Sequence, residues 1–220
     1  MVDSILTHDH LLKSLQTLPV PGCYRVAYSG GLDSHVLLQL MVDLSEKLKA
    51  GVNAIHINHG IHANAGTWQS HCKRVCSSLG VELVTRSISA ADPGSESPEA
   101  WARQLRYREL QGLLNENDML LTAHHRDDQA ETLLLQLFRG SGPAGLSAMP
   151  ACKPFGNGWH ARPLLGFTRE QIRNYAESAG LEWIEDDSNR DQGLDRNFIR
   201  HRLMPVIRER WPSATKTLAR

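Results

Sequence analysis

The chain has 220 residues, with 24 Lys or Arg and 24 Asp or Glu, so its formal net charge is zero. A hydrophobic content of 41% supplies one good-sized core and excludes a disordered chain, a collagen and a disulfide-dense secreted scaffold. No window approaches the roughly 18 apolar residues of a membrane span, and residues 1–15 lack a signal-peptide layout. We therefore expect a cytoplasmic protein without a membrane partner, and charge alone indicates no nucleic acid.

Short β-rich runs alternate with helical ones through the first 139 residues. In chain order the pattern predicts strands at 24–28, 52–58, 82–88 and 119–123, which are followed by helices at 34–48, 64–79, 98–114 and 126–139. Alternation at this period predicts an α/β fold, a Rossmann-like parallel sheet with helices on both faces. Ligands of such sheets bind beyond the carboxyl ends of the strands, so the informative residues should follow the strands.

Beyond residue 139 the alternation becomes less regular. Residues 140–158 are rich in Gly, Pro and Ser, and Thr168 with Gln171 forms a capping box for a helix that stops at Gly180. A last helix is predicted at 196–210, interrupted near Pro205. We divide the chain into a catalytic domain at 1–150 and a small, mainly helical C-terminal part at 151–220 that ends in a basic helix.

The four cysteines form no C-x-x-C pair. Cys72 and Cys76 lie one helical turn apart beside His71, but no second ligand pair follows at a zinc-like spacing. Buried free thiols are the favoured interpretation.

A glycine-rich loop connects the first strand to its helix. Paired glycines let the backbone curl so that successive N–H groups and the helix N-terminus face one cavity, where an anion binds. The alternative is a tight turn with a polar cap, and the loop is not a Walker A motif. Its string is Ser29, Gly30, Gly31, Leu32, Asp33 and Ser34.

This string resembles the pyrophosphate-binding loop of the N-type ATP pyrophosphatases, which cleave ATP between its α- and β-phosphates and adenylate a carbonyl oxygen. The resemblance implies an adenine nucleotide alpha hydrolase-like fold and ATP binding by residues 29–34. It also implies that Asp33 helps to place Mg²⁺, since a carboxylate beside phosphates needs a bridging cation.

Acidic residues open the helix after the fourth strand. Asp127 and Asp128 suit the dipole of a helix N-terminus, which is one explanation for them. Asp128 and Glu131 also share a helix face, where they would repel each other unless a cation or an ammonium group lies between them. The adjacent His124 and His125 diverge, so hydrogen-bonding roles are favoured over a shared metal.

A longer series of motifs runs in order along the chain between residues 24 and 211. The motifs are His56-Ile-Asn-His59-Gly60, His124-His-x-Asp-Asp-Gln-x-Glu-Thr132, Arg139-Gly-Ser-Gly-Pro-Ala-Gly-Leu-Ser-Ala-Met149, Arg162-Pro-Leu-Leu165, Asp187-Ser-Asn189 and Arg196-Asn-Phe-Ile-Arg-His201. This ordered set resembles the tRNA(Ile)-lysidine synthetase family. The resemblance implies a two-step reaction: ATP adenylates the oxygen on carbon 2 of the wobble cytidine of an isoleucine tRNA, and the ε-amine of free lysine then displaces AMP.

The resemblance also implies roles for single residues. Asp128 and Glu131 would hold the lysine ammonium, and one of them would accept its proton. Arg196 would hold the lysine carboxylate or a phosphate. With Asp33 these residues form the predicted catalytic set, and His59 lies where the family places adenosine.

The expected partners are ATP, L-lysine and the anticodon loop of the tRNA. We assign tRNA contacts to Arg106, Arg139, Arg200 and Arg202, although a solvated basic face is the alternative for Arg106. Residues 196–220 hold seven Lys or Arg and one acid, giving +6, whereas residues 1–195 hold 17 and 23, giving −6. Resolved along the chain, the neutral total permits RNA binding.

Three alternatives stay open: another enzyme with this loop, such as a tRNA thiolase; an amidotransferase-linked synthetase; or a non-catalytic nucleotide sensor. The missing C-x-x-C pairs count against thiolation, and the retained carboxylates count against a sensor. Family members usually continue into tRNA-gripping C-terminal domains, which are not expected within 220 residues. A dimer is left open.

Overall fold

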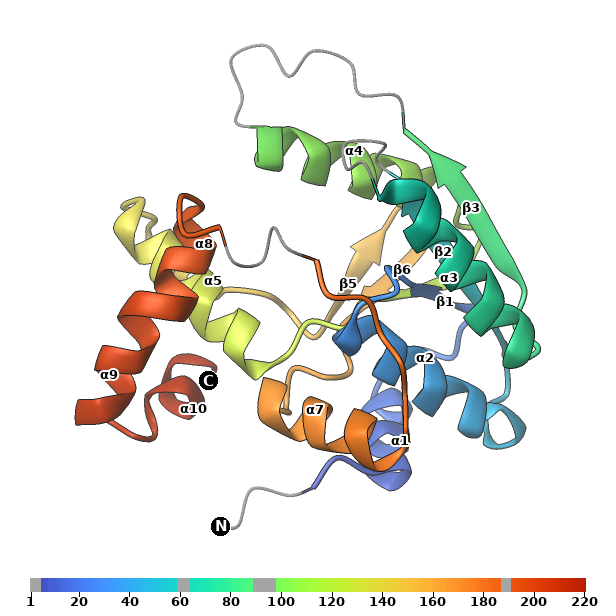
Figure 1. Cartoon of the computed structure of the whole chain (residues 1–220), viewed down its shortest axis with the longest axis horizontal. Coiled ribbons are helices and arrows are strands. Elements are labelled where there is room, and N and C mark those ends of the chain that lie inside the picture. Colours follow the sequence, from blue (N-terminus) through green and yellow to red (C-terminus); the bar gives the residue numbers. More distant parts are fainter. Residues whose placement is uncertain (1–4, 59–63, 89–97, 187–190) are drawn as a thin grey trace.

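The structure is a computed structural model that describes residues 5–58, 64–88, 98–186 and 191–220. Its centre is a six-stranded sheet in the order β3-β2-β1-β4-β6-β5 (Figure 1). The strands pair in parallel except β5, which runs antiparallel to β6. The strands are β1 (Cys23–Ala27), β2 (Gly51–Asn58), β3 (Leu83–Ser87), β4 (Met119–Leu121), β5 (Cys152–Phe155) and β6 (Gly158–Ala161).

Helices connect the strands and form a separate group after the sheet. The helices up to α7 are α1 (His8–Gln16), α2 (Leu32–Asp43), the short η1 (Ser45–Lys47), α3 (Ala65–Ser78), α4 (Pro98–Gly112), α5 (Arg126–Phe138), α6 (Pro143–Leu146) and α7 (Arg169–Ser178). The last segment contains α8 (Asp195–Phe198), the π-helical turn η3 (Ile199–Leu203), α9 (Met204–Arg210) and α10 (Ala214–Leu218).

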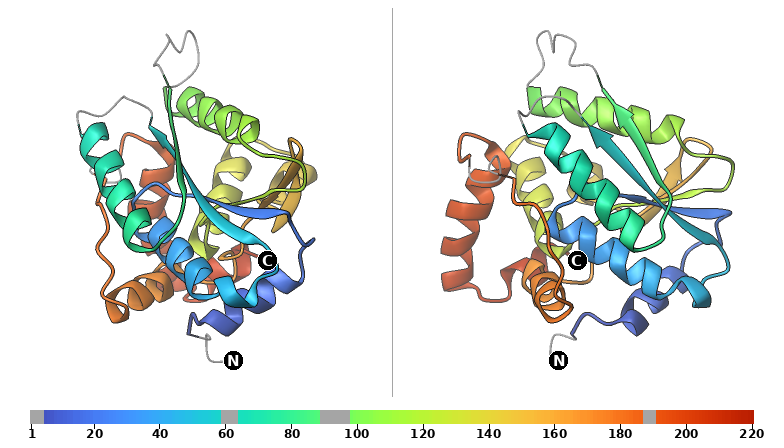
Figure 2. Two further views of the ribbon diagram at one scale, coloured as in Figure 1. Left: turned by 90° about the vertical axis from the view of Figure 1, so that its right-hand side faces the viewer. Right: turned by 45° about the vertical axis from the view of Figure 1, so that its right-hand side comes forward.

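The two faces of the sheet carry different cores. On one face, Val26 of β1 and Leu121 of β4 pack in a large cluster with buried residues of α1, α2, α3 and α7. On the other face, Leu120 of β4 packs with Leu110 of α4. Figure 2 (left) shows the sheet between α4 on one side and α2 and α3 on the other. The alternation of side chains along each strand thus supplies both cores, and the expected α/β class is confirmed.

A third, smaller core joins α5 to the end of the chain. Ala130 and Leu134 of α5 pack against Ile199 of η3 and Met204 of α9. Segments far apart in the sequence therefore lie side by side, with α5, α8, α9 and α10 gathered at one end of the molecule (Figure 1).

The predicted elements up to residue 139 are confirmed with shifted ends. The predicted helix at 34–48 ends as an α-helix at Asp43 and continues as the separate turn η1. The Thr168–Gln171 capping box is present, with both reciprocal hydrogen bonds, at the start of α7. The last predicted helix is interrupted, but by the π-helical turn at 199–203, which precedes Pro205.

Five elements of the described chain were not predicted: α1, α6, α10 and the two strands of the β5–β6 hairpin. The hairpin falls partly in the Gly-, Pro- and Ser-rich segment, and β6 joins β4 in the same sheet as the first four strands. The boundary at residue 150 stays a prediction. In the part of the chain that the structure describes, no helix is long and apolar enough to cross a membrane.

Candidate functional site

The glycine-rich loop lies at the carboxyl end of β1, where it leads into α2. Gly31 is the N-cap of α2, has an extended backbone and supplies no side-chain cap. The first N–H groups of α2 therefore have no partner within the helix and can bind an anion at the loop. The two loop hydroxyls bond within the loop: the Oγ atoms of Ser29 and Ser34 lie 3.0 Å apart, and the Ser34 hydroxyl donates to the Gly31 carbonyl at 3.0 Å. In this structure the serines therefore shape the loop.

Gly30 requires its glycine for two reasons. Its φ of +85° is in the left-handed region, which residues with a Cβ disfavour. An added Cβ would also lie 3.0 Å from the Cys72 Sγ and 3.3 Å from the Ile184 Cδ1. The Gly30 carbonyl in turn accepts a hydrogen bond from the Ile184 N–H at 2.9 Å, which joins the loop to the segment after α7.

His125 connects this loop to the start of α5. Its side chain caps the helix by accepting from the Asp128 N–H at 3.3 Å through Nδ1, while the Asp128 carboxylate accepts from the His125 N–H at 2.9 Å. The other ring nitrogen, Nε2, lies 3.3 Å from Asp128 Oδ2 and 3.8 Å from Asp33 Oδ2. One buried imidazole therefore bridges the carboxylates that follow β1 and β4.

Asp128 and Glu131 meet two cations from the end of the chain. Arg196 Nε donates to Glu131 at 2.9 Å and its Nη2 to Asp128 at 3.1 Å. Arg200 donates to the same two carboxylates, at 2.7 Å from Nε to Glu131 and 3.2 Å from Nη2 to Asp128. We call these four residues the carboxylate–arginine cluster. The two acids do share a face, as predicted, and the positive charge between them is supplied by arginine.

The cluster sets the acidity of its aspartate. Burial by itself would raise the pKa of Asp128, but His125 and Arg196 outweigh it and lower the pKa to about 2. The carboxylate is therefore ionised at neutral pH and is a weak base while the guanidinium groups remain in place. Glu131, with 2% of its side chain exposed, is the most enclosed of the four.

Asp33 has the features that a cation site requires. Its Oδ1 is buried and lacks a hydrogen-bond donor among the described residues. Burial and the neighbouring Asp128 raise its pKa, which His125 and the nearby arginines oppose, and 33% of the side chain remains exposed. An unpaired carboxylate oxygen beside an anion-binding loop is a donor that Mg²⁺ prefers, so the residues fit this ion.

The residues predicted to bind tRNA lie in three places. Arg200 is inside the carboxylate–arginine cluster, whereas Arg106 is on the exposed side of α4. Arg139, the C-cap of α5, makes an exposed ion pair with Asp195 at 3.5 Å, and Arg202 donates to Gln192 at 2.8 Å. The tRNA contacts of these four arginines stay a prediction, and His59 lies outside the described residues.

A hydrogen-bonded group of polar residues beside the site was not predicted. Thr122, just after β4, contacts both His124 and His160 of β6, and His160 in turn contacts Arg162 just after β6. The sequence signal was present, because residues 160 and 162 are polar positions next to a strand end. It was missed because β6 itself was not predicted.

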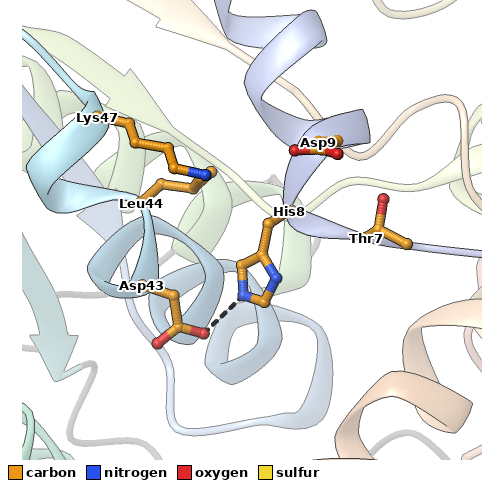
Figure 3. Close-up of a pocket in the computed structure, with 6 residues that line it drawn as sticks. All are labelled: Thr7, His8, Asp9, Asp43, Leu44 and Lys47. Carbon is orange, nitrogen blue, oxygen red and sulfur yellow. Dashed lines mark hydrogen bonds and ion pairs between the residues drawn. The ribbon is translucent and has the colours of Figure 1, made fainter.

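One described cavity lies away from this site. It has a volume of about 390 Å³ and lies where α1 faces the end of α2, so it is at the far end of α2 from the glycine-rich loop (Figure 3). His8 Nε2 and Asp43 Oδ2 are hydrogen-bonded at 2.8 Å across it. It is open to solvent and is lined by none of the loop or cluster residues, so the site is identified by the chemistry of the strand ends and not by this cavity.

The thiols follow the sequence expectation in part. Cys72 and Cys76 are buried, and burial raises the pKa of Cys72 to about 12 and that of Cys76 to about 11. Cys23 and Cys152 are half-buried instead. The thiols of α3 are therefore protonated packing groups at neutral pH.

Sequence comparisons agree on one family of proteins. The profile of the PP-loop domain family matches residues 7–207. Similar proteins called tRNA(Ile)-lysidine synthase occur in Methylococcus capsulatus (52% identical, covering 90% of this chain and 45% of that protein), in Coxiella burnetii (43%, covering 98% and 48%) and in Pseudomonas aeruginosa (47%, covering 96% and 48%). The chain spans about half the length of these relatives.

Among solved structures, the chain is similar to the U34-tRNA thiolase NcsA from Methanococcus maripaludis with its [4Fe-4S] cluster. The TM-score is 0.79 at 17% identity, covering 96% of this chain and 75% of that one. At this identity the likeness concerns the fold. It agrees with the mostly parallel sheet described above.

Proposed function

The chain belongs to the PP-loop domain family, and we propose that it is the catalytic part of a tRNA(Ile)-lysidine synthetase. The observation that carries this proposal is the carboxylate–arginine cluster. His125 connects this cluster to Asp33 of the glycine-rich loop. This arrangement lies between the neighbouring strands β1 and β4. From β1 the chain continues through β2 and β3 to one edge of the sheet, and from β4 it continues to the other edge, so the strand order reverses at this point. Open α/β sheets bind their ligands at such a point.

In the first step the glycine-rich loop holds ATP. The cytidine O2 attacks the α-phosphorus, an O–P bond forms, and pyrophosphate leaves with the electrons of the broken bond. The N–H groups of the loop and the start of α2 face the departing anion. Mg²⁺ held by Asp33 would neutralise phosphate charge there.

In the second step the lysine Nε attacks carbon 2 of the base. The C–N bond forms while the C–O bond to AMP breaks, and the amine loses a proton. Asp128 and Glu131 are the anions that attract the ammonium group, as the resemblance implies. Because Asp128 has a pKa of about 2 beside the arginines, we propose that it anchors the ammonium, and that a carboxylate accepts the proton only once lysine has displaced a guanidinium.

The displaced arginines then have an evident role. Arg196 contacts both carboxylates in this structure, and a guanidinium that leaves them can pair with the lysine carboxylate or with a phosphate. The substrates of this reaction occur in the cytoplasm, where we expect the protein to act.

The decisive experiment measures AMP release and incorporation of labelled lysine into an isoleucine tRNA or its anticodon stem-loop. Product formation should require ATP, lysine and the RNA together, and Asp33→Asn should lower it at least 100-fold, because the phosphate-binding loop loses its cation ligand. Asp9→Asn, which makes the same change at an exposed position of α1, is a matched control. Pyrophosphate release with ammonia or glutamine in place of lysine, without RNA, would overturn the proposal.

A further inference from the structure

A chain of three hydrogen bonds runs from Arg162 to His124 beside the proposed site. Arg162 Nη2 lies 3.3 Å from His160 Nδ1, His160 Nε2 lies 2.8 Å from Thr122 Oγ1, and that oxygen lies 2.8 Å from His124 Nδ1. His160 is fully buried, and Thr122 and Arg162 are nearly so. The four residues come from the carboxyl ends of the neighbouring strands β4 and β6.

Both imidazoles in this chain are uncharged at neutral pH. Burial lowers the pKa of His124 to about 3, and burial together with Arg162 lowers that of His160 to about 2. Each ring therefore has one nitrogen that donates and one that accepts.

The arginine fixes the direction of the first two bonds, and the third follows because the described contacts offer the Thr122 hydroxyl hydrogen no acceptor other than His124 Nδ1. A guanidinium only donates, so His160 Nδ1 must accept and its proton must be on Nε2. That N–H donates to Thr122, whose own hydroxyl hydrogen is then directed to His124 Nδ1. The remaining proton of His124 is consequently on Nε2.

The Nε2 atom of His124 is available to a ligand. Among the described residues it has no hydrogen-bond partner, and the side chain is partly exposed. Asp128 and Arg196 both act on the ring electrostatically, so His124 lies beside the carboxylate–arginine cluster.

We infer that Arg162, His160 and Thr122 are positioning residues that hold His124 as a fixed Nε2–H donor, which selects a substrate group with an acceptor atom. On the proposed function, the unprotonated ring nitrogen N3 of cytosine is such an acceptor, whereas the N–H at the same position of uracil is not. The carbonyl oxygen on carbon 2 is common to both bases, so the arrangement favours cytosine over uracil where His124 Nε2–H faces N3.

The tautomer is measured by long-range ¹H–¹⁵N NMR of the histidine rings in the full chain, with the His124→Gln variant identifying the His124 signals. The wild type should show the Nε2–H form. Thr122→Val removes the hydroxyl and should give a mixture of tautomers, whereas Thr122→Ser keeps the hydroxyl and should retain the wild-type form. An Nδ1–H form in the wild type, or an unchanged spectrum in Thr122→Val, would overturn the inference.

A second pair of variants tests the role of His160. His160→Gln has an oxygen that accepts from Arg162 and an N–H that donates to Thr122, so His124 should keep the Nε2–H form. His160→Leu breaks the chain and should behave like Thr122→Val. Thermal unfolding of each pair identifies any variant that has not folded, and equal tautomer populations in folded His160→Gln and His160→Leu would contradict a positioning role.

Activity provides the last readout. With a cytidine-34 anticodon stem-loop, Thr122→Val should lower the kcat for lysidine formation about tenfold, as expected for the removal of one hydrogen bond, with the KM for ATP unchanged and Thr122→Ser near wild type. Wild-type kcat in Thr122→Val would overturn the selecting role. If neither the wild type nor any variant forms lysidine while the histidine NMR spectra change as expected, the proposed function is wrong and the tautomer assignment stands.

Discussion

At the scale of single residues, the proposed site depends on how a few charges are paired. Two acids on one face of α5 are stable because Arg196 and Arg200 each contact both of them. Half of this arrangement was predictable, since the spacing of Asp128 and Glu131 called for a cation between them. The identity of that cation was not, because no local pattern relates residue 200 to residue 131. Arg196 and Arg200 are four residues apart, which lets both reach the two carboxylates, but only the fold shows that their helical segment packs beside α5.

Glu131→Gln tests the stability of this cluster. The variant leaves two guanidinium groups facing an amide, with only one acceptor oxygen instead of a carboxylate. Breaking a buried pair costs about 3–5 kcal/mol, and because the arginines are partly exposed we expect about 2 kcal/mol. Urea unfolding measures the change. Glu177→Gln on the exposed side of α7 should differ from wild type by less than about 0.5 kcal/mol, and an equal destabilisation of both variants would contradict the role of the cluster.

The depressed pKa of Asp128 predicts a pH dependence. Since the folded state holds this carboxyl ionised down to about pH 2, its contribution is fully present above the ordinary carboxyl pKa near 4 and is lost as the pH falls toward 2. The stability difference between wild type and Asp128→Asn should therefore shrink by about 2 kcal/mol between pH 5 and pH 2. Urea unfolding across this range tests it, with Asp9→Asn, exposed at the start of α1, expected to parallel wild type. A pH-independent difference would refute it.

At the scale of elements, β1, α2 and the loop between them were readable from sequence because apolar spacing and a Gly-Gly turn coincide there. The β5–β6 hairpin was not readable. β5 contains Pro154 and is an antiparallel edge strand, where proline is tolerated but the usual alternation is weak. Since His160 and Arg162 accompany β6, the polar chain beside the site was missed together with the strand.

The glycine-rich loop supports a prediction with a matched control. Gly30→Ala must place a Cβ at a φ of +85° and 3.0 Å from the Cys72 Sγ. We expect a destabilisation of about 2 kcal/mol, which lowers Tm by about 5 °C in a chain of this size, together with weaker ATP binding.

Gly31→Ala is the control, because its φ is −80° and the nearest atom to an added Cβ is the Ser29 Oγ at 3.6 Å. It should lower Tm by no more than about 1 °C. Differential scanning calorimetry and ATP titration calorimetry provide both readouts. A Tm equally low in both variants would show that the left-handed backbone is not what distinguishes Gly30.

At the scale of the whole molecule, part of the positive charge of the last segment is neutralised by ion pairs with acidic residues of α5. Of the seven basic residues after position 195, Arg196 and Arg200 pair with the cluster acids and Arg208 with Asp127. The +6 charge of this stretch therefore exaggerates what it presents to RNA. The sequence could place the charge in the last segment, but only the fold shows how much of it faces acids.

The exposed arginines should account for the salt dependence of RNA binding. Arg139→Gln and Arg202→Gln should each weaken binding of the proposed tRNA and reduce the slope of log K against log salt by about 0.7–0.9 for each phosphate that the variant no longer neutralises. Fluorescence anisotropy across a range of roughly 50 to 300 mM salt, where screening is strong, measures the slope. Lys47→Gln on η1 beside the cavity of Figure 3 should leave it unchanged, and slopes equal to wild type in the arginine variants would exclude these residues from the RNA interface.

The distance along the chain between the two halves of the cluster has a consequence for biosynthesis. Arg196 and Arg200 follow Glu131 by 65 and 69 residues. A ribosome adding about 5–20 residues per second needs roughly 3–14 s to make this stretch. During that interval the nascent chain already contains the first four strands of the sheet and α5, but Asp128 and Glu131 have no guanidinium groups to meet and must remain hydrated. The sheet can therefore assemble during translation, whereas the carboxylate–arginine cluster of the proposed site is completed only when the segment containing α8 has emerged.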